Sequence, residues 1–230
     1  MKKGIVVLIL SIFLASCDLV ELNVETETII DWIDFVKINN QEYWAHSNLV
    51  ISDASFIGGK VGEVTFNVDK NVKDTNYQIK NGDAAYLDEG TALYSVKNMP
   101  NVIAVQDEFS INGYRIYELN DVEQNINVDF QKLAISKIEI YESLDKQPYY
   151  RLNNELVERK EIDTLISVLD EGIKKIETNN YSEEGPLYYD IVFYTDEPLA
   201  SIYPLYKEDK WYWIPWEVEG LADNIATFIK

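Results

Sequence analysis

The sequence predicts an all-β N-terminal domain followed by an α+β C-terminal domain, an antiparallel sheet with two helices on one side. Three observations lead to this prediction. Residues 30–119 contain short runs of alternating apolar and polar residues, separated by turn signals and without helical periodicity. Residues 135–230 combine one amphipathic helical segment with several aromatic-rich strands. The polar stretch between them, residues 120–134, is predicted to be a linker.

The predicted N-terminal domain consists mainly of hairpins. The expected strand pairs are residues 33–38 with 42–44, residues 84–87 with 92–96, and residues 102–105 with 114–117. The turns between them contain Asn39-Asn40, Asp88-Glu89-Gly90 and Asn112-Gly113, residue types that adopt positive φ at low cost. A further half-buried strand is expected at residues 64–68, after a β-turn at Gly58-Gly59-Lys60.

The predicted C-terminal domain contains the clearest helix of the chain. Its apolar residues recur at the spacing of one helical face: Ile162, Leu165, Ile166, Leu169, Ile173 and Ile176. Strands are expected at residues 135–141, 149–152, 188–195, 199–206 and 211–214. A short closing helix is expected over residues 218–229. The order of strand, strand, helix, three strands and helix is typical of an α+β domain.

The charge of the chain excludes several classes of partner. The 230 residues include 40 acidic and 20 basic side chains, a formal net charge of −20. Nucleic acid is excluded as a partner, because phosphate binding requires a basic face. Cationic, neutral or hydrophobic partners are favoured over anionic surfaces. The single cysteine excludes a disulfide framework within the chain.

The first seventeen residues have the anatomy of an export signal. Lys2 and Lys3 precede an apolar run at residues 5–14, which is about half the ~20 residues that cross a bilayer. Leu14-Ala15-Ser16-Cys17 resembles the lipobox of bacterial lipoproteins. This resemblance implies cleavage after residue 16, lipidation of Cys17, and an anchor on the extracytoplasmic face of the cell membrane. Loss of Lys2 and Lys3 would change the formal charge from −20 to −22.

Residues 17–29 are then expected to be an acidic, lipidated tether. Two alternatives remain for the N-terminus: an ordinary signal peptide with an incidental cysteine, and an uncleaved anchor.

Two further stretches carry a resemblance. The segments KIEIY, EIDTLISVL, YYDIVFY and KWYWI, in that order within residues 135–230, resemble a C-terminal domain of unknown function in lipoproteins of Gram-positive bacteria. The segments EVTFNV and IKNGDAAYLDEGTALYSV are similar to an uncharacterised region of such proteins. The resemblance implies a fold and a location, and it brings no catalytic residues.

The sequence contains no catalytic motif. His46 is the only histidine, so neither a Ser-His-Asp triad nor a metal site with two imidazoles is predicted, and His46 could act only as a lone base. Gly58-Gly59-Lys60 lacks the spacing of a phosphate-binding loop, and residues 69–80 fail the pattern of an EF-hand loop. No cofactor is predicted. Asp83, Asp88 and Glu89 are weak candidates for a looser cation site.

The most distinctive stretch is KWYWIPWE, residues 210–217. Trp211 and Trp213 lie on one face of the predicted strand, and Trp216 follows Pro215 on the same side. If exposed, the three indoles would form a platform for sugar rings or for a protein partner. If buried, they would be core beneath the amphipathic helix.

These observations predict a membrane-anchored, extracytoplasmic lipoprotein that acts as a non-enzymatic binding or interaction module of the cell envelope. The expected partners are the membrane, through the Cys17 lipid, and an envelope protein, a peptide or a wall glycan. The alternative is an envelope hydrolase that uses paired carboxylates or a carboxylate-bound divalent cation.

Overall fold

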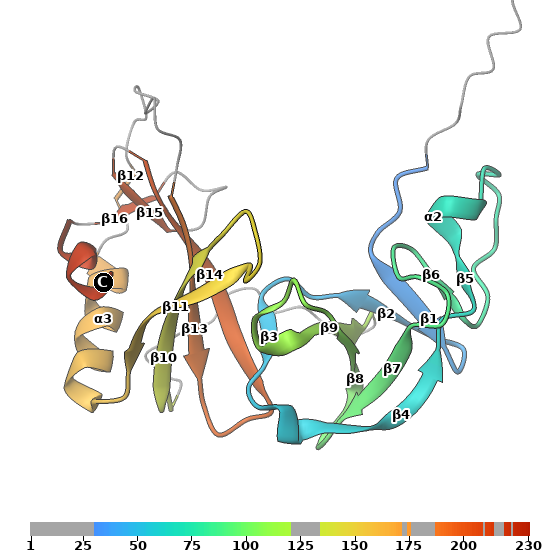
Figure 1. Ribbon diagram of the computed structural model, residues 1–230, viewed down its shortest axis with the longest axis horizontal. Helices are drawn as coiled ribbons and strands as arrows, with labels where there is room; N and C mark the ends of the chain where they lie inside the picture. The colour runs from blue at the N-terminus through green and yellow to red at the C-terminus, as the bar shows by residue number, and fades with distance from the viewer. Residues whose placement is uncertain are drawn as a thin grey trace, which may run out of the picture. The chain divides into compact units, whose positions relative to one another are not determined.

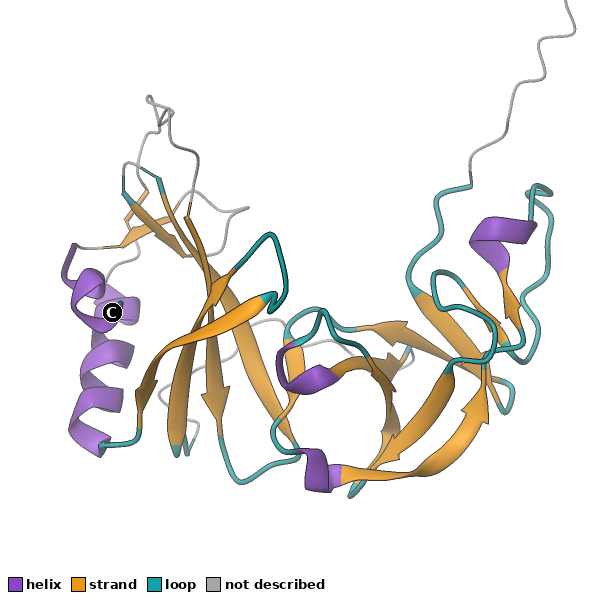
Figure 2. Cartoon of the chain, in the orientation of Figure 1, coloured by secondary structure: helices purple, strands orange, loops and turns teal. Residues whose placement is uncertain are grey.

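The computed structural model describes residues 30–120, 134–171, 174–175, 187–208, 210–213, 219–221 and 223–230. Within these ranges the protein is mainly β, and its strands form two sheets (Figures 1 and 2). All strand pairs except β5 with β6 are antiparallel. Asp31–Lys230 form one compact unit. In the ranges listed above, no helix is long and apolar enough to cross a membrane.

The first sheet is strongly curled, as Figure 1 shows. Its strand order is β4 (Ile57–Glu63), β7 (Ala92–Val96), β8 (Met99–Gln106), β9 (Tyr114–Leu119), β2 (Gln41–Ala45), β1 (Phe35–Ile38), β6 (Asp83–Ala84) and β5 (Phe66–Asn67). A core cluster joins side chains from distant strands of this sheet, among them Val36, Leu93, Val105 and Tyr117. The alternating apolar positions of the strands therefore supply one buried face.

Two of the predicted hairpins are confirmed, and both depend on left-handed turn residues. β1 and β2 pair with Phe35 opposite Trp44, around Asn39 with φ 53° and Asn40 with φ 62°. β8 and β9 pair around the 3₁₀ turn η2 (Ile111–Gly113), where φ is 60° at Asn112 and 77° at Gly113. Asparagine and glycine adopt this backbone region with little strain, which is why the turns could be predicted.

The turn predicted at Gly58-Gly59-Lys60 is wrong, because these residues lie within strand β4. Their glycines permit close approach between strands. A Cβ atom at Gly58 would lie 2.2 Å from Ser95 Oγ, and one at Gly62 would lie 2.0 Å from Ile38 Cδ1. The pairing of β4 with β7 also shifts register twice, as expected where bulges interrupt a ladder.

The hairpin predicted for residues 84–87 with 92–96 is also wrong. β6 pairs with β1 and β5, whereas β7 pairs with β4 and β8. The strand predicted at residues 64–68 is reduced to β5, because the short helix α2 (Val68–Asn71) begins there. Asn67 caps this helix by accepting a hydrogen bond from Lys70 N at 2.8 Å.

The second sheet contains the strands predicted near the C-terminus. Its order is β11 (Tyr150–Leu156), β10 (Lys137–Ser143), β13 (Leu187–Tyr194), β14 (Leu199–Lys207), β15 (Trp211–Trp213), β16 (Glu219–Leu221) and β12 (Lys174–Lys175). One strand joins this sheet from the N-terminal part of the chain. β3 (Leu49–Ile51), which follows β2 and precedes η1 (Ala54–Phe56), pairs with Leu199–Ser201 of β14. The sequence pattern did not predict β3.

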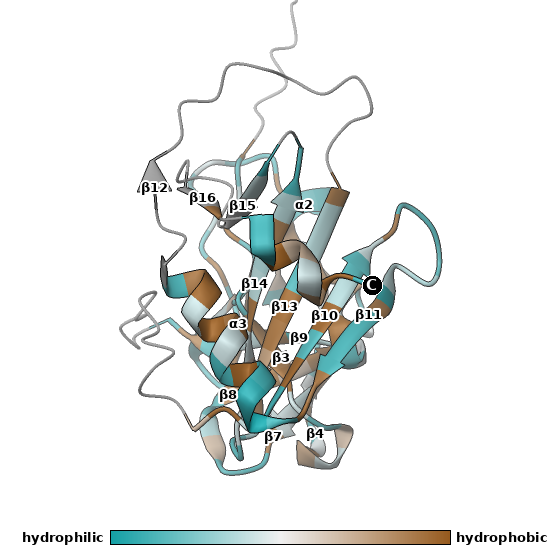
Figure 3. Ribbon diagram, turned by 90° about the vertical axis from the view of Figure 1, so that its left-hand side faces the viewer, coloured by the Kyte–Doolittle hydropathy of each residue, from teal (hydrophilic) through white to brown (hydrophobic). Residues whose placement is uncertain are grey.

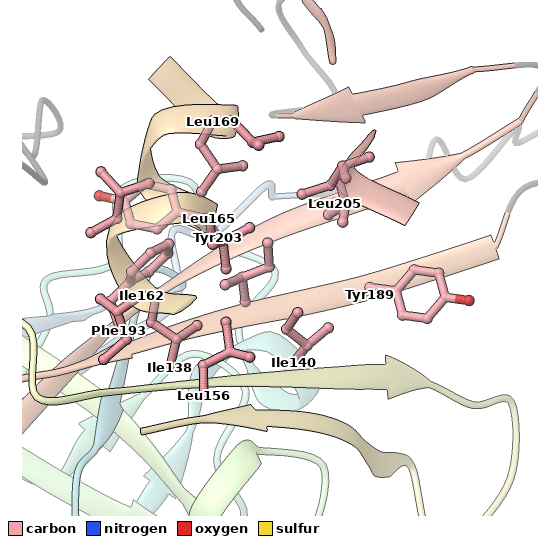
Figure 4. Close-up of a cluster of buried hydrophobic side chains, with 14 of the residues drawn as sticks. Ile138, Ile140, Leu156, Ile162, Leu165, Leu169, Tyr189, Phe193, Tyr203 and Leu205 are labelled. Atoms are coloured by element: carbon pink, nitrogen blue, oxygen red, sulfur yellow. The ribbon is translucent and has the colours of Figure 1, made fainter. Parts of the chain in front are cut away.

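One face of the second sheet carries the helix α3 (Arg159–Glu171) and the 3₁₀ helix η3 (Asp223–Phe228) (Figures 1 and 3). Figure 4 shows Ile162, Leu165 and Leu169 of α3 above Ile138 and Ile140 of β10. The helical spacing of apolar residues thus predicted this buried face correctly.

Two details of the C-terminal prediction need correction. The helix was expected to include Ile173 and Ile176, which lie outside the described residues, but Lys174–Lys175 between them form strand β12. The closing helix is shorter and of the 3₁₀ type, because Glu219–Leu221 form strand β16 before it. Most of the predicted linker, residues 121–133, lies outside the described part of the chain.

Candidate functional site

The predicted tryptophan platform loses one of its members. Trp211 has only 4% of its surface exposed, and its ring centroid lies 5.8 Å from that of Tyr189 in the core beneath α3. Trp211 therefore stabilises the fold and is inaccessible to a ligand. The side chain of Trp213 and all of Trp216 lie outside the described part of the structure, so their role stays a prediction.

The predicted carboxylates serve separate purposes. Asp83 is 3% exposed and accepts hydrogen bonds from Tyr77 Oη at 2.9 Å and Lys80 N at 2.7 Å. Asp88 is exposed and pairs with Lys70, and Glu89 is exposed. Within the described residues, no three His, Cys, Asp or Glu side chains are placed to hold a metal ion. Cys17, the predicted lipidation site, lies outside those residues.

A pocket of about 430 Å³ lies where β3 and η2 approach β14 and β11. Its lining combines apolar side chains with a few polar ones. The lining residues are Asp34, Ala45, His46, Ser47, Leu49, Val50, Phe109, Ser110, Ile111, Arg115, Ile116, Tyr150 and Ile202. Both sheets contribute walls, and β3 places Leu49 and Val50 between them. A mainly apolar pocket of this size with few polar groups is typical of ligand sites.

The polar wall of the pocket is organised around Arg115. Its Nη1 atom lies 3.2 Å from Asp34 Oδ2, and its Nε and Nη2 atoms each lie 2.9 Å from Asp107 Oδ2. Asp34 also accepts a hydrogen bond from Tyr117 Oη at 3.0 Å. Burial raises the pKa of Asp34, although Tyr117 and Arg115 act in the opposite direction. The effect of burial on this pKa therefore exceeds that of its two hydrogen-bond partners.

His46 lines the same pocket and is held in its neutral form. Burial lowers the pKa of His46, against the opposing charge of Glu118, whose Oε2 lies 4.0 Å from His46 Nε2. His46 Nδ1 accepts a hydrogen bond from Asn48 N at 3.4 Å, which leaves the proton on Nε2. A neutral histidine adds no positive charge to this wall at pH 7.

A second pocket of about 630 Å³ adjoins the first and shares Ser110, Ile111 and Tyr150 with it. Its other lining residues are Glu108, Asn112, Tyr141, Gln147, Pro148 and Tyr149. Between the two pockets, the rings of Phe109 and Tyr149 meet with centroids 4.5 Å apart. We refer to the two adjoining pockets together as the groove.

The floor of the groove is held by a buried hydrogen-bond network around Glu139. Glu139 Oε2 accepts hydrogen bonds from Tyr194 Oη at 2.5 Å and Tyr141 Oη at 2.7 Å. Glu139 Oε1 accepts one from Lys137 Nζ at 2.6 Å. Asn112 Nδ2 donates both to Tyr194 Oη at 3.1 Å and to the carbonyl oxygen of Ile51 at 2.8 Å. The network thereby connects β10 and β13 to η2 and β3, which bear groove residues.

Asp190 is a half-buried carboxyl on β13 whose charge acts on the groove residue Tyr150. Its neighbours Tyr189 and Ile191 pack in the core under α3, so Asp190 points to the opposite face of β13. Burial raises the pKa of Asp190 to about 6, although Ser143 Oγ donates a hydrogen bond to it at 3.1 Å. Burial, and then the charge of Asp190, raise the pKa of Tyr150.

The substitution Asp190→Asn should stabilise the protein at pH 8 and have little effect at pH 4. Because its folded pKa is raised, ionised Asp190 destabilises the fold as pH rises from about 4 to about 6. The expected gain at pH 8 is on the order of 1 kcal/mol, since solvent screening reduces the effect of a partly exposed group. Thermal unfolding at both pH values measures it. Asp196→Asn, at an exposed residue that lines neither pocket, is the control. Equal shifts at both pH values would contradict the prediction.

Sequence reasoning did not single out most of the groove residues. His46 was considered only as a lone base, and Asp34, Phe109, Arg115 and Tyr150 were not considered. One signal was available: Arg115 is one of only three arginines in the sequence, and it lies between apolar residues of a predicted strand. A charged side chain on a half-buried strand requires a partner of opposite charge, so its presence indicates a polar site nearby.

Comparison of the chain with protein-family models, with curated proteins and with solved structures finds no match in any of the three.

Proposed function

We propose that this protein is a lipoprotein anchored to the extracytoplasmic face of the cell membrane, where it acts as a non-enzymatic binding module of the envelope. The signal anatomy of residues 1–16 and the lipobox-like Leu14-Ala15-Ser16-Cys17 support the anchor. The resemblance to lipoproteins of Gram-positive bacteria, noted above, supports the same location.

We propose further that residues 30–119 and 135–230 are two domains, each built on one of the two sheets. Two core clusters that each draw on one sheet support this division, one around Tyr117 and one around Leu165. A third cluster packs Val50 and Ile111 against the second sheet and joins the two parts. In this arrangement β3 extends from the first domain to pair with β14 of the second. A binding site at the junction of two domains is common among ligand-binding proteins.

The observation that carries the binding function is the groove. Its first pocket, of about 430 Å³, falls within the range of roughly 300–1,000 Å³ that is typical of ligand sites. Its walls are apolar, and its polar groups gather on one side, around Arg115 and Asp34. Such a distribution provides both buried contact area and orientation for a ligand.

The anchor is tested by metabolic labelling with palmitate. The full chain should incorporate label and sediment with membranes, and the variant Cys17→Ala should do neither. Label retained by Cys17→Ala would overturn the proposal of lipidation at this residue. The expected difference is all or none, because two acyl chains give lasting attachment.

The binding function is tested by occupying the groove. Ser47 is exposed and lines the first pocket, so Ser47→Trp would place an indole at its mouth. Thr75→Trp, at an exposed residue that lines neither pocket, is the matched control. The immobilised full chain should retain a component of an envelope extract. The Thr75→Trp variant should retain the same component, and the Ser47→Trp variant should not. Equal retention by both variants would exclude the groove as the binding site. Release of a cleaved product would instead favour the hydrolase.

A further inference from the structure

We infer that the first pocket of the groove binds a basic side chain of a peptide, with the ammonium or guanidinium group beside Asp34 and the aliphatic stem against the apolar walls. This inference rests on the proposed binding function and adds the chemical class of the ligand.

The charges around the pocket are unbalanced. Two carboxylates, those of Asp34 and Asp107, contact one guanidinium, that of Arg115, and a third, that of Glu118, lies beside His46. These carboxylate side chains are 24%, 11% and 18% exposed, so bulk water solvates them only partly. His46 is neutral and does not offset them. A half-buried site with excess negative charge is stabilised by a cation that enters it.

Arg115 is unsuited to receiving an anionic ligand here. Its Nε and Nη2 atoms both face Asp107, and its Nη1 atom faces Asp34. An incoming carboxylate or phosphate would compete with these two aspartates for the guanidinium. The formal net charge of −20 on the whole chain adds to this repulsion.

The remaining walls match the stem of a basic side chain. Leu49, Val50, Ile116 and Ile202 line the pocket with aliphatic groups. Lysine and arginine bury three or four methylenes while their charge stays near a polar partner. Tyr150 adds an aromatic face, which is favourable for a cation.

The second pocket provides for the residues that flank the basic one. Gln147, Asn112 and Glu108 line it with amide and carboxylate groups, and Tyr149 and Pro148 add flat surfaces. Backbone amides of an extended peptide form hydrogen bonds with such groups. A neutral glycan could also contact them, but it would leave the negative charge of the first pocket uncompensated. The charge therefore favours a peptide.

Three blocked pentapeptides test the inference: acetyl-Ala-Ala-X-Ala-Ala-amide with X as lysine, norleucine or glutamate. Norleucine has the aliphatic stem of lysine without the charge. Dissociation constants are measured by calorimetry with the full chain in detergent micelles, at low and high salt, and an uncharged N-acetylglucosamine tetramer serves as the glycan probe. The lysine peptide should bind at least about tenfold more tightly than the norleucine peptide, with weakening at high salt. The glutamate peptide should bind most weakly.

Variants locate the cation. Asp34→Asn should weaken the lysine peptide about tenfold and affect the norleucine peptide much less, because asparagine retains an oxygen for Tyr117 Oη although it loses the ion pair with Arg115. Asp196→Asn removes the same charge at an exposed turn and is the control. Thermal unfolding of Asp34→Asn verifies that the variant is folded. Ser47→Trp should weaken binding of the lysine peptide. Phe109→Ala should also weaken it, and this substitution should leave the fold intact because Phe109 is 54% exposed.

The outcomes separate the inference from the proposed function. Equal affinity for the lysine and norleucine peptides, or binding of the glycan alone, would overturn the basic-peptide inference while the groove remained a binding site. Binding that is unchanged in Ser47→Trp and in Phe109→Ala would overturn the proposed site itself. Tenfold selectivity for the lysine peptide over the norleucine peptide, lost in Asp34→Asn and kept in Asp196→Asn, would support both the basic-peptide inference and the proposed binding site.

Discussion

The substitution Glu139→Gln is expected to lower the free energy of unfolding by about 2–4 kcal/mol at pH 7. Glu139 is 7% exposed, and three donors surround its carboxylate: Lys137, Tyr141 and Tyr194. A glutamine side chain has one acceptor and one donor in place of two acceptors. Whichever way the amide turns, its NH₂ group faces a lysine ammonium or two tyrosine hydroxyls. Chemical denaturation of the full chain measures the loss.

Glu155→Gln is the matched control for this substitution. Glu155 lies opposite Glu139 in the ladder of β10 and β11, but it is exposed. Substitutions at exposed positions generally change stability by less than about 0.5 kcal/mol. A similar cost at both positions would show that the network does not stabilise the fold.

The same carboxylate should make stability depend on acid pH. Burial alone would raise the pKa of Glu139, but hydrogen bonds from Lys137, Tyr194 and Tyr141 outweigh burial and lower it. Because the folded pKa is depressed, the stabilisation is present above the pKa of the unfolded carboxyl, and it is lost as pH falls through the folded value. The stability difference between wild type and Glu139→Gln should therefore shrink below about pH 4.

The substitution Leu165→Ala is expected to cost about 2–5 kcal/mol of unfolding free energy. Leu165 has none of its surface exposed, and it lies between α3 and the sheet in Figure 4. Removing its branched end leaves a cavity against Ile138 and Ile140, which strands of a paired sheet cannot move to fill. The cost should appear in denaturant melts without a change in m-value.

Leu152→Ala provides the comparison, because it removes the same atoms from a leucine that is 49% exposed in β11. Its expected cost is below about 1 kcal/mol. If both substitutions cost the same, the contacts of α3 with the sheet would not be a main source of stability.

Local sequence patterns were sufficient where adjacent residues determine the structure. Asn39-Asn40 and Asn112-Gly113 identified two hairpins, because these residue types adopt the positive φ of a tight turn at little cost. The spacing of Ile162, Leu165 and Leu169 identified α3 and its buried face. These signals depend on a few neighbouring residues and need no knowledge of distant partners.

Patterns failed where the partner of a segment lies far along the chain. Gly58-Gly59-Lys60 resembles a turn in sequence, but these residues form a strand in which Gly58 and Gly62 lie close to the side chains of Ser95 and Ile38 on other strands. Residues 84–87 resemble one arm of a hairpin with residues 92–96, yet Ala84 pairs with Val36. Strand pairing is a long-range choice, and short apolar runs specify it weakly.

The sequence by itself determined the mainly β character of the chain, the position of α3 and the excess of negative charge. Only the tertiary structure decided that Trp211 belongs to the core. It also brings Arg115 together with Asp34, 81 residues earlier, and with Asp107, 8 residues earlier, to form one charged wall of the first pocket. Turns and helices follow from local backbone preferences. A pocket depends on which distant strands pair, as β3 does with β14, and that choice is made by the burial of the whole core.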